Sequence, residues 1–185
     1  MQLAALGPSL SGRPAAAVVD TRVSLYVRSM VAAADEDGKT FESLLSLHRY
    51  FLNADYLRDA FQKRMNTRTS ASADSLTATM DDHIALSQWY ASIYVVIEGW
   101  RECRLNDDRL DMLLEGDRVD RLRIFRNQVF HFQRAYDNPK LLAFLGSDDG
   151  DAEAATAWIR DTHVALATAI EAALQGHIDA RTGQA

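Results

Sequence analysis

Residues 80–104 carry the most apolar helical pattern in the chain. Large apolar residues recur there on most sides of a helix axis instead of forming one stripe: Ile84, Leu86, Trp89, Tyr90, Ile93, Tyr94, Val96, Ile97 and Trp100. A helix that is apolar around most of its circumference must be covered by neighbouring elements on several sides. The segment therefore predicts the central helix of a helical bundle.

The rest of the chain also favours helix over sheet. It has three prolines and few runs of β-branched residues. Apolar residues at three-to-four spacing predict further helices over five segments: 18–34, 40–65, a short piece ending at Gly116, 117–136 and 151–175. We therefore expect an all-α fold, a helical bundle of about five main helices with mostly short connections.

Polar and flexible residues mark the breaks between these helices. Residues 35–38 end in Gly38, a natural helix stop. Residues 66–80 are rich in Ser, Thr and Ala without periodicity and predict a loop, after which Asp81 or Asp82 could cap the next helix. The acidic residues 147–151 lack the spacing of a calcium loop, and capping of the last helix explains them better.

The length fits one domain. Residues 1–17 contain Gly and Pro among small residues and predict a flexible arm; residues 18–176 form a single domain, and 177–185 a C-terminal tail. The net charge of −6 argues against nucleic-acid binding driven by a global positive field, but leaves a local basic site open. One cysteine, Cys103, excludes an internal disulfide. With no signal peptide and no apolar run long enough for a membrane span, we expect a cytoplasmic protein without a membrane partner.

The segment 117–136 has two different faces. Its apolar stripe indicates an ordinary core-facing side: Leu122, Phe125, Val129, Phe132 and Tyr136. The opposite side carries Asp120, Arg123, Asn127, His131 and Arg134, flanked by Ile124 and Phe130. Large apolar residues beside polar ones indicate a partly covered surface, and a subunit interface is the simplest cover.

Positive charge is concentrated in the same segment. Between Arg118 and Arg134 there are five arginines and one acidic residue, Asp120, although the chain is acidic overall. Arg presents a planar fork suited to phosphate or carboxylate. The pattern therefore allows two interpretations, an anion-binding surface or arginines that pair with Asp and Glu of neighbouring helices.

Arg126, Asn127 and His131 together have the parts needed for acid–base phosphodiester chemistry. A histidine titrates near neutrality, an amide can orient it, and a fixed cation can offset charge that builds on phosphate. A single helix histidine is also commonly structural. On one helix Arg126 and His131 would point about 140° apart, so two copies of the helix across a two-fold axis would combine them more easily than one.

Residues 126–131, Arg-Asn-Gln-Val-Phe-His, resemble the signature of the HEPN superfamily (higher eukaryotes and prokaryotes nucleotide-binding domain). That signature is an Arg, usually followed by a polar residue, then a His after four to six positions, near the start of a late helix in an all-α bundle. The apolar segment 94–100 is also similar to uncharacterised bacterial members. The resemblance extends over 18–175 but is specific only in 122–136. Several family motifs have Tyr two positions after the His, where this chain has Gln133.

The resemblance implies a metal-independent ribonuclease whose site forms where two subunits bring their motifs together. His131 would then transfer a proton at the ribose 2′-OH or the leaving oxygen, Arg126 would neutralise the scissile phosphate, and Asn127 would orient the site. Arg123, Arg134 and Phe130 are candidates for RNA contacts. No cofactor or metal is expected. Many members are toxins paired with an antitoxin protein or belong to phage defence; others are inactive and bind a nucleotide or a protein partner.

Glu98 is a candidate supporting residue, because it interrupts an apolar run and would need a partner if buried. Arg126 is one candidate partner and another arginine is equally suitable. The five histidines form no HExxH motif, which argues against a metalloenzyme. The three tryptophans at helical spacing indicate core packing better than base stacking.

Overall fold

The computed structural model describes residues 36–67, 76–134, 139–146 and 148–183. These residues form an all-α helical bundle, with no β-strand among them, so the predicted fold class is confirmed. Contacts divide the chain into two units, residues 1–39 and residues 40–185. Apart from the first turn of α2, the helices belong to the second unit. The predicted arm 1–17 and helix 18–34 lie outside the described residues.

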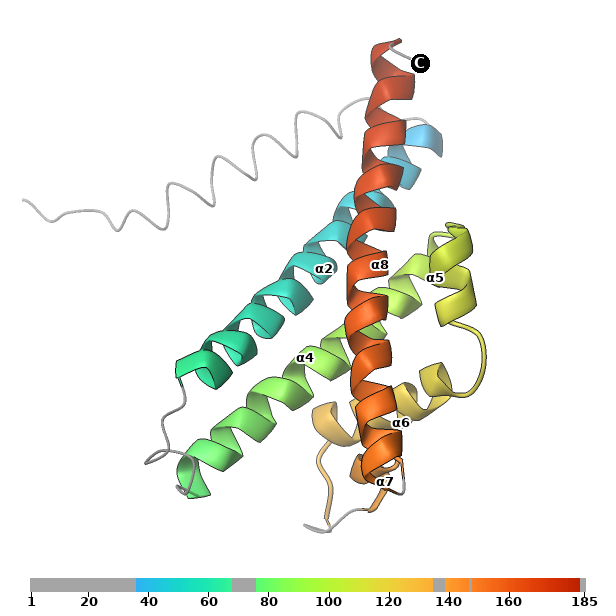
Figure 1. Cartoon of the computed structure of the whole chain (residues 1–185). Helices are drawn as coiled ribbons and strands as arrows, with labels where there is room; N and C mark the ends of the chain where they lie inside the picture. Colours follow the sequence, from blue (N-terminus) through green and yellow to red (C-terminus); the bar gives the residue numbers. More distant parts are fainter. Residues whose placement is uncertain (1–35, 68–75, 135–138, 147, 184–185) are drawn as a thin grey trace, which may run out of the picture. The chain divides into compact units, whose positions relative to one another are not determined.

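Three long helices and three shorter ones follow one another in the described part of the chain (Figure 1). They are α2 (Glu36–Thr67), α4 (Leu76–Glu102), α5 (Asp108–Leu113), α6 (Arg118–Phe130), α7 (Pro139–Leu142) and α8 (Asp149–Thr182). α4 runs antiparallel to α2, since Arg64 of α2 bonds to Asp82 of α4 while Gly99 of α4 lies against Leu47 of α2. α4 also packs against α6 and α8.

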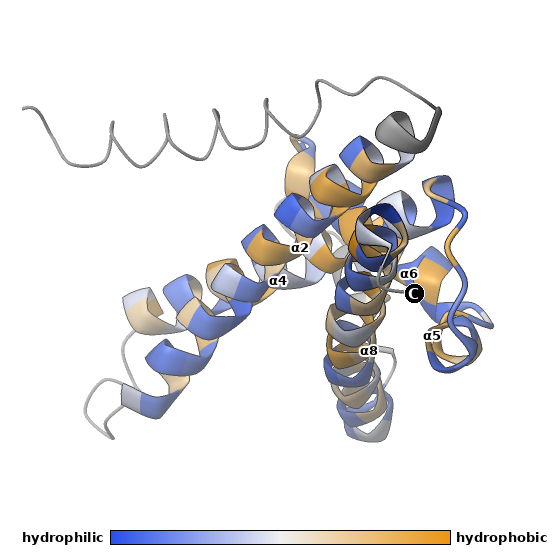
Figure 2. Ribbon diagram, turned by 90° about the horizontal axis from the view of Figure 1, so that it is seen from above, coloured by the Kyte–Doolittle hydropathy of each residue, from blue (hydrophilic) through white to orange (hydrophobic). Residues whose placement is uncertain are grey.

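The prediction that α4 is the central helix is confirmed. From Ser87 onward it is buried on most sides, with Trp89, Tyr90, Ile93 and Ile97 at most 2% exposed. Its first turns differ, because Ile84 is 55% exposed and Leu76 and Met80 are exposed as well. In Figure 2 hydrophobic and hydrophilic residues alternate along the ribbons, as expected of helices that are partly buried and partly exposed.

Aromatic side chains connect the helices through the core. Trp89 lies against Phe61 of α2, with 6.0 Å between ring centroids, and against Tyr90, with 5.1 Å. From Tyr90 the ring contacts continue to Phe125 of α6, then to Phe144, which lies between α7 and α8, and then to Trp158 of α8. Trp89, Trp100 and Trp158 are all buried, which confirms the prediction that they are core residues.

Several predicted boundaries are wrong. α2 begins at Glu36, so Gly38 lies inside a helix instead of ending one; a long helix tolerates a single glycine at a cost of about 1 kcal/mol. The prediction of a loop over 66–80 is wrong at both ends, since α2 continues to Thr67 and α4 begins at Leu76, while residues 68–75 lie outside the described residues. α8 continues to Thr182, so most of the predicted tail 177–185 is helical.

Acidic side chains near the starts of α4 and α8 have different roles. Arg64 bonds to Asp81 and Asp82, which lie inside α4 and hold its start against the end of α2 instead of capping it. At the start of α8 the Asp148 carboxylate accepts a hydrogen bond of 2.9 Å from the backbone N–H of Asp151. The capping role predicted for the acidic residues 147–151 is thereby confirmed for Asp148.

Candidate functional site

α6 positions the candidate site, and it is shorter than predicted. Its inner side is held by Val119, Leu122 and Phe125, which are buried against the rest of the bundle. The helix ends at Phe130, and His131 is the C-cap residue with extended backbone angles of φ −115° and ψ 140°. The prediction of a helix over 117–136 is therefore wrong for residues 131–134, and its last two residues lie outside the described residues.

The reason is that the apolar stripe loses its packing partner at this point. Phe132, predicted to be in the core, is 91% exposed, and Tyr136 lies outside the described residues. Helices in proteins persist mainly where an apolar face is packed. The side chain of Gln133 also donates a hydrogen bond of 2.8 Å to the carbonyl oxygen of His131, which satisfies an acceptor at the helix end.

Arg126 is the best-connected residue of the candidate set. Its Nη2 donates a hydrogen bond of 2.7 Å to Oε2 of Glu98 on α4, and its Nη1 donates one of 3.0 Å to Oδ1 of Asn127. The guanidinium carbon lies 5.2 Å from the centroid of the Tyr94 ring, within cation–π distance. The Glu98–Arg126 ion pair, one of the pairings that the sequence allowed, is confirmed.

Tyr94 is a member of this cluster that the sequence analysis did not single out. Burial raises its pKa, and the charge of Glu98 and a hydrogen bond to the Glu98 side chain raise it further. The hydroxyl therefore stays protonated and can donate to the carboxylate. Tyr94 and Glu98 are one turn apart on α4, and this i, i+4 spacing was the available signal.

His131 has very different surroundings. It is exposed, and the described part of the chain gives its imidazole no hydrogen-bond partner. Its backbone N–H donates to the carbonyl oxygen of Asn127 at 3.2 Å, so the two residues are joined through the backbone. Because His131 has left the helix, the separation of about 140° expected between Arg126 and His131 does not apply.

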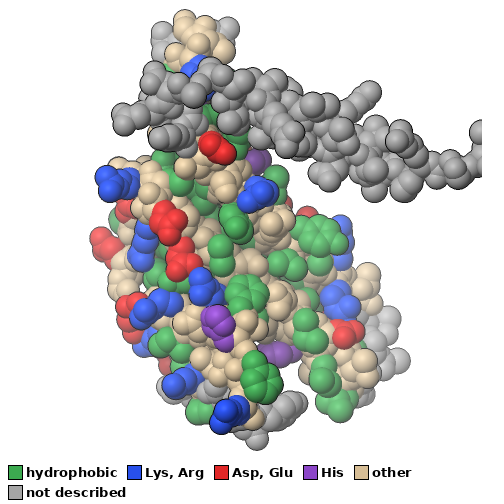
Figure 3. Space-filling model, turned by 180° about the vertical axis from the view of Figure 1, so that it is seen from behind, with side chains coloured by type: hydrophobic (Ala, Val, Ile, Leu, Met, Phe, Trp, Pro, Cys, Tyr) green, Lys and Arg blue, Asp and Glu red, His purple; other side chains and the backbone are tan. Residues whose placement is uncertain are grey.

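The remaining predicted site residues lie on the surface. Arg123, Arg134, Phe130 and Ile124 are all exposed. Hydrophobic, basic and histidine side chains are intermixed on one face of the molecule (Figure 3). The exposed large apolar residues on α6 and just after it are Ile124, Phe130 and Phe132, and we call them the α6 apolar patch.

The structure supports pairing with a neighbouring helix for one arginine of the arginine-rich segment, and the anion-binding surface stays a prediction. Arg121 pairs with Asp117 at 2.6 Å and Arg123 with Asp120 at 3.5 Å, in each case within or next to α6. Such exposed pairs contribute about 0–1 kcal/mol and leave the arginines accessible to other anions. Among these three arginines, Arg126 is the one that pairs with a neighbouring helix.

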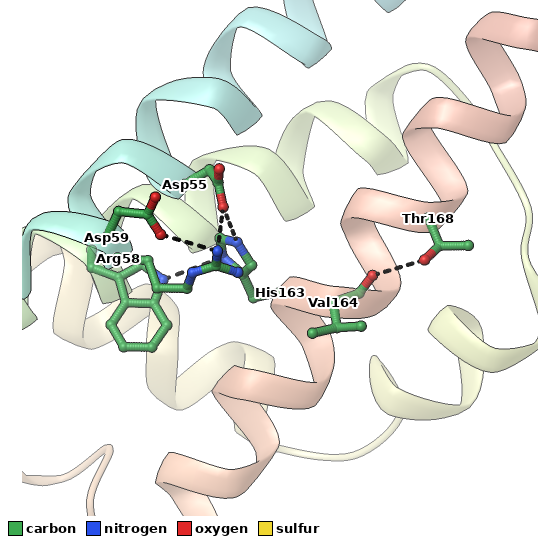
Figure 4. Close-up of polar contacts among 7 residues, drawn as sticks. Asp55, Arg58, Asp59, His163, Val164 and Thr168 are labelled. Atoms are coloured by element: carbon green, nitrogen blue, oxygen red, sulfur yellow. Dashed lines mark hydrogen bonds and ion pairs between the residues drawn. The ribbon is translucent and has the colours of Figure 1, made fainter. Parts of the chain in front are cut away.

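A second polar cluster, which the sequence pattern did not predict, lies in the core. His163 of α8 is fully buried; Nε1 of Trp89 donates to its Nδ1 at 3.3 Å, and its Nε2 lies 3.0 Å from Oδ1 of Asp55. Figure 4 shows His163 pointing toward Asp55 of α2, with Arg58 beside the carboxylate. Since Nδ1 accepts from an indole N–H, Nε2 must carry the proton and donate it to Asp55.

This core cluster is built for stability. Burial is the main cause that lowers the pKa of His163, and the hydrogen bond that His163 donates to Asp55 opposes it. The imidazole is neutral, satisfied on both sides, and connects α2, α4 and α8. It has no exposed atom with which to act on a substrate.

Other chemistry has little support in the described residues. No group of three or more His, Cys, Asp or Glu side chains there could hold a metal ion. Burial raises the pKa of the Cys103 thiol, and the charge of Glu102 adds to the effect, so the reactive thiolate is disfavoured. None of the helices described combines the length and the apolar character that a membrane span requires.

No family model matches the sequence, and no match is found among curated proteins or solved structures. Function must therefore be inferred from the geometry of the residues around Arg126 and His131.

Proposed function

We propose that this chain is a metal-independent endoribonuclease of HEPN type that acts in the cytoplasm as a toxin or phage-defence effector. Its site would be completed across the interface of a homodimer. RNA would be the substrate, and an antitoxin protein the natural partner of a toxin. The proposal needs no cofactor.

The observation that carries the proposal is the contrast between Arg126 and His131. Arg126 is a fixed cation, held by Glu98, Asn127 and the Tyr94 ring. His131, five residues further along, is exposed and its imidazole has no partner in the described residues. A positioned cation beside an available acid–base group suits phosphodiester cleavage.

The chemistry would use the ribose itself as nucleophile. One imidazole removes the proton of the 2′-OH, the 2′ oxygen attacks phosphorus, and the 5′ oxygen leaves with a proton from an acid. The products are a 2′,3′-cyclic phosphate and a 5′-hydroxyl end. Arg126 would offset the negative charge on the pentavalent phosphate. Because each chain contributes one His131, two copies would supply both the base and the acid.

The α6 apolar patch supports the dimeric arrangement. Phe130 and Phe132 flank His131 in the chain and are exposed, and Ile124 is exposed on the same helix. Exposed apolar side chains that form one continuous area mark contact surfaces. A second copy across a two-fold axis would cover the patch and bring the two His131 side chains together.

A second candidate function is an inactive HEPN-like module that binds a nucleotide or a protein partner. One observation favours it: Arg126 is already neutralised by Glu98 of its own chain. An arginine in that state can serve the fold without contacting a phosphate.

The deciding experiment is cleavage of mixed RNA by purified protein in EDTA. Wild type would be compared with Arg126→Ala and His131→Ala, and with Arg121→Ala and His83→Ala as matched controls from other exposed positions. We expect cleavage by the wild type and both controls, with 2′,3′-cyclic phosphate ends, and loss of cleavage in the two site variants.

Cleavage that is equal in all five proteins would exclude this site, and absence of cleavage in all five would favour the binding module. Growth arrest on expression of the wild type, but not of His131→Ala, would support the toxin role. Normal growth with an active enzyme would argue against it.

A further inference from the structure

Two of the three guanidinium nitrogens of Arg126 already have hydrogen-bond partners in the structure. Nη2 is bonded to Glu98 and Nη1 to Asn127, while the guanidinium lies over the Tyr94 ring. Its Nε is buried and has no hydrogen-bond partner among the described residues. The Glu98 carboxylate thus occupies a position on the guanidinium where an oxyanion ligand would bind.

Carboxylate and phosphate compete for the same arginine geometry. The planar fork of Arg donates the same hydrogen bonds to the oxygen atoms of either anion. Both members of the pair can be reached from solvent, since the Arg126 side chain is 25% exposed and that of Glu98 is 40% exposed. The Glu98 carboxylate can therefore leave Arg126 and remain solvated, so an incoming anion need not bury it.

Tyr94 holds Glu98 in this position from the other side. A hydrogen bond joins the Tyr94 and Glu98 side chains, and both residues project from α4 one turn apart. The carboxylate is therefore bound between a cation of α6 and a hydroxyl of its own helix. Loss of either bond should loosen it.

We propose that Glu98 is a gate on Arg126: a phosphate group binds there only by displacing the Glu98 carboxylate from the guanidinium. The affinity of the site for phosphate is then set by the strength of the Glu98–Arg126 pair. Identifying RNA as the bound anion rests on the proposed function, whereas the competition between the two anions does not.

The alternative is that Glu98 positions Arg126 for the phosphate, and the two roles predict opposite signs. Removing the charge of a gate frees the cation and raises phosphate affinity. Removing the charge of a positioning residue lets the cation move and lowers phosphate affinity. A binding measurement on Glu98→Gln therefore separates them.

The experiment is the binding of a fluorescent 2′-O-methyl RNA oligonucleotide, which lacks the nucleophile and cannot be cleaved by this chemistry. Anisotropy would be measured at fixed ionic strength, with inorganic phosphate as competitor. We expect Glu98→Gln to bind RNA about three- to tenfold more tightly than wild type, the range expected for loss of one partly exposed ion pair. Phosphate should compete better by a similar factor.

Three further variants complete the test. Glu102→Gln makes the same change in net charge one turn away at an exposed position, and its affinity should equal that of the wild type. The double variant Glu98→Gln/Arg126→Ala should lose the gain. Tyr94→Phe keeps the ring but removes the bond to Glu98, and should bind RNA about twofold more tightly. It also serves as the second test if Glu98→Gln lowers the melting temperature of the protein.

An affinity of Glu98→Gln equal to or below that of the wild type, or an equal gain in Glu102→Gln, would overturn the gate. Tighter binding by Glu98→Gln without RNA cleavage by the wild type would support the gate and contradict the ribonuclease function. Cleavage by the wild type without tighter binding in Glu98→Gln would keep the nuclease and remove the gate.

Discussion

His163 and His131 lie in the same bundle, yet they differ in burial and in the number of hydrogen-bond partners. His163 is buried, and both of its ring nitrogens have partners, in Trp89 and Asp55. His131 is exposed and has no side-chain partner in the described residues. Residue type and spacing alone therefore do not distinguish a structural histidine from one that can act in acid–base catalysis, whereas burial and the number of hydrogen-bond partners do.

The physical reason lies in what a proton transfer would cost. Protonating His163 would break its bond from Trp89 and place a charge in the core beside Arg58. Protonating His131 breaks no such bond, and water solvates the charge. A group that exchanges protons during a reaction must belong to the second kind.

The largest effect should separate the two histidines by activity. His131→Ala should lower RNA cleavage about 10²- to 10⁴-fold, the contribution of a general acid or base, with the melting temperature unchanged. Single-turnover cleavage and thermal unfolding of the same preparation would check it. Retained cleavage by His131→Ala, or a lower melting temperature of this variant, would contradict the assignment of His131 as a catalytic and not a structural histidine.

The second effect should separate them by stability. His163→Ala leaves a cavity and takes the partner from the Trp89 indole and from Asp55, so we expect a loss of about 2–4 kcal/mol in the free energy of unfolding. Urea unfolding with His131→Ala as the control would measure it. A loss below 1 kcal/mol, the size typical of one net hydrogen bond, would show that the cluster is not a stabilising element.

The third test concerns the proposed homodimer, in which the α6 apolar patch and His131 would lie at the subunit interface. Phe132→Ser should weaken the dimer by about 2 kcal/mol, the loss typical of an interface hot spot, without destabilising the monomer. Sedimentation equilibrium would measure this, with Met112→Ser on exposed α5 as the control. An unchanged self-association constant, or a wild type that is monomeric, would contradict the proposed dimer.

The fourth effect concerns pH and the buried histidine. Burial lowers the pKa of His163, so at acid pH the unfolded chain takes up a proton that the folded chain refuses. The free energy of unfolding should therefore fall as pH drops below about 6.5, by at most about 1.4 kcal/mol per pH unit from this residue. Unfolding of wild type and His163→Gln between pH 8 and 5 would isolate the contribution. Parallel pH profiles would contradict the assignment.

The smallest effect is the direct coupling of Glu98 and Arg126. A double-mutant cycle on the free energy of unfolding, with alanine at each position, should give about 0.5–1 kcal/mol, since both side chains are partly exposed. A coupling near zero would mean that the pair contributes nothing to stability, and Arg126 would then be held mainly by Asn127 and the Tyr94 ring.

Much of the fold could be predicted from local pattern. The apolar residues of α4 indicated a buried central helix, and from Ser87 onward it is one. Trp89 and Trp100 were expected in the core and are there. Side-chain pattern is sufficient in these cases because a helix that is apolar on most sides has one way to avoid water, which is to lie between others.

The candidate site was predicted only in part. The pairing of Glu98 with Arg126 was one of the possibilities that the sequence left open, because a carboxylate in an apolar run needs a partner if it is buried and another arginine was equally suitable. The end of α6 at Phe130 was missed, since its apolar stripe continues on paper to Tyr136. Nothing in that stripe tells where the neighbouring core stops.

The sequence by itself determined that this chain is helical, which helix is central, and which short segment combines Arg126, Asn127 and His131. Tertiary structure alone decided that His131 is outside the helix, that Phe132 is exposed, and that Asp55 and Trp89 meet at His163. Helical pattern depends on neighbours three and four residues away. Helix ends and buried polar bonds depend on partners far along the chain, and here Asp55 and His163 are 108 positions apart.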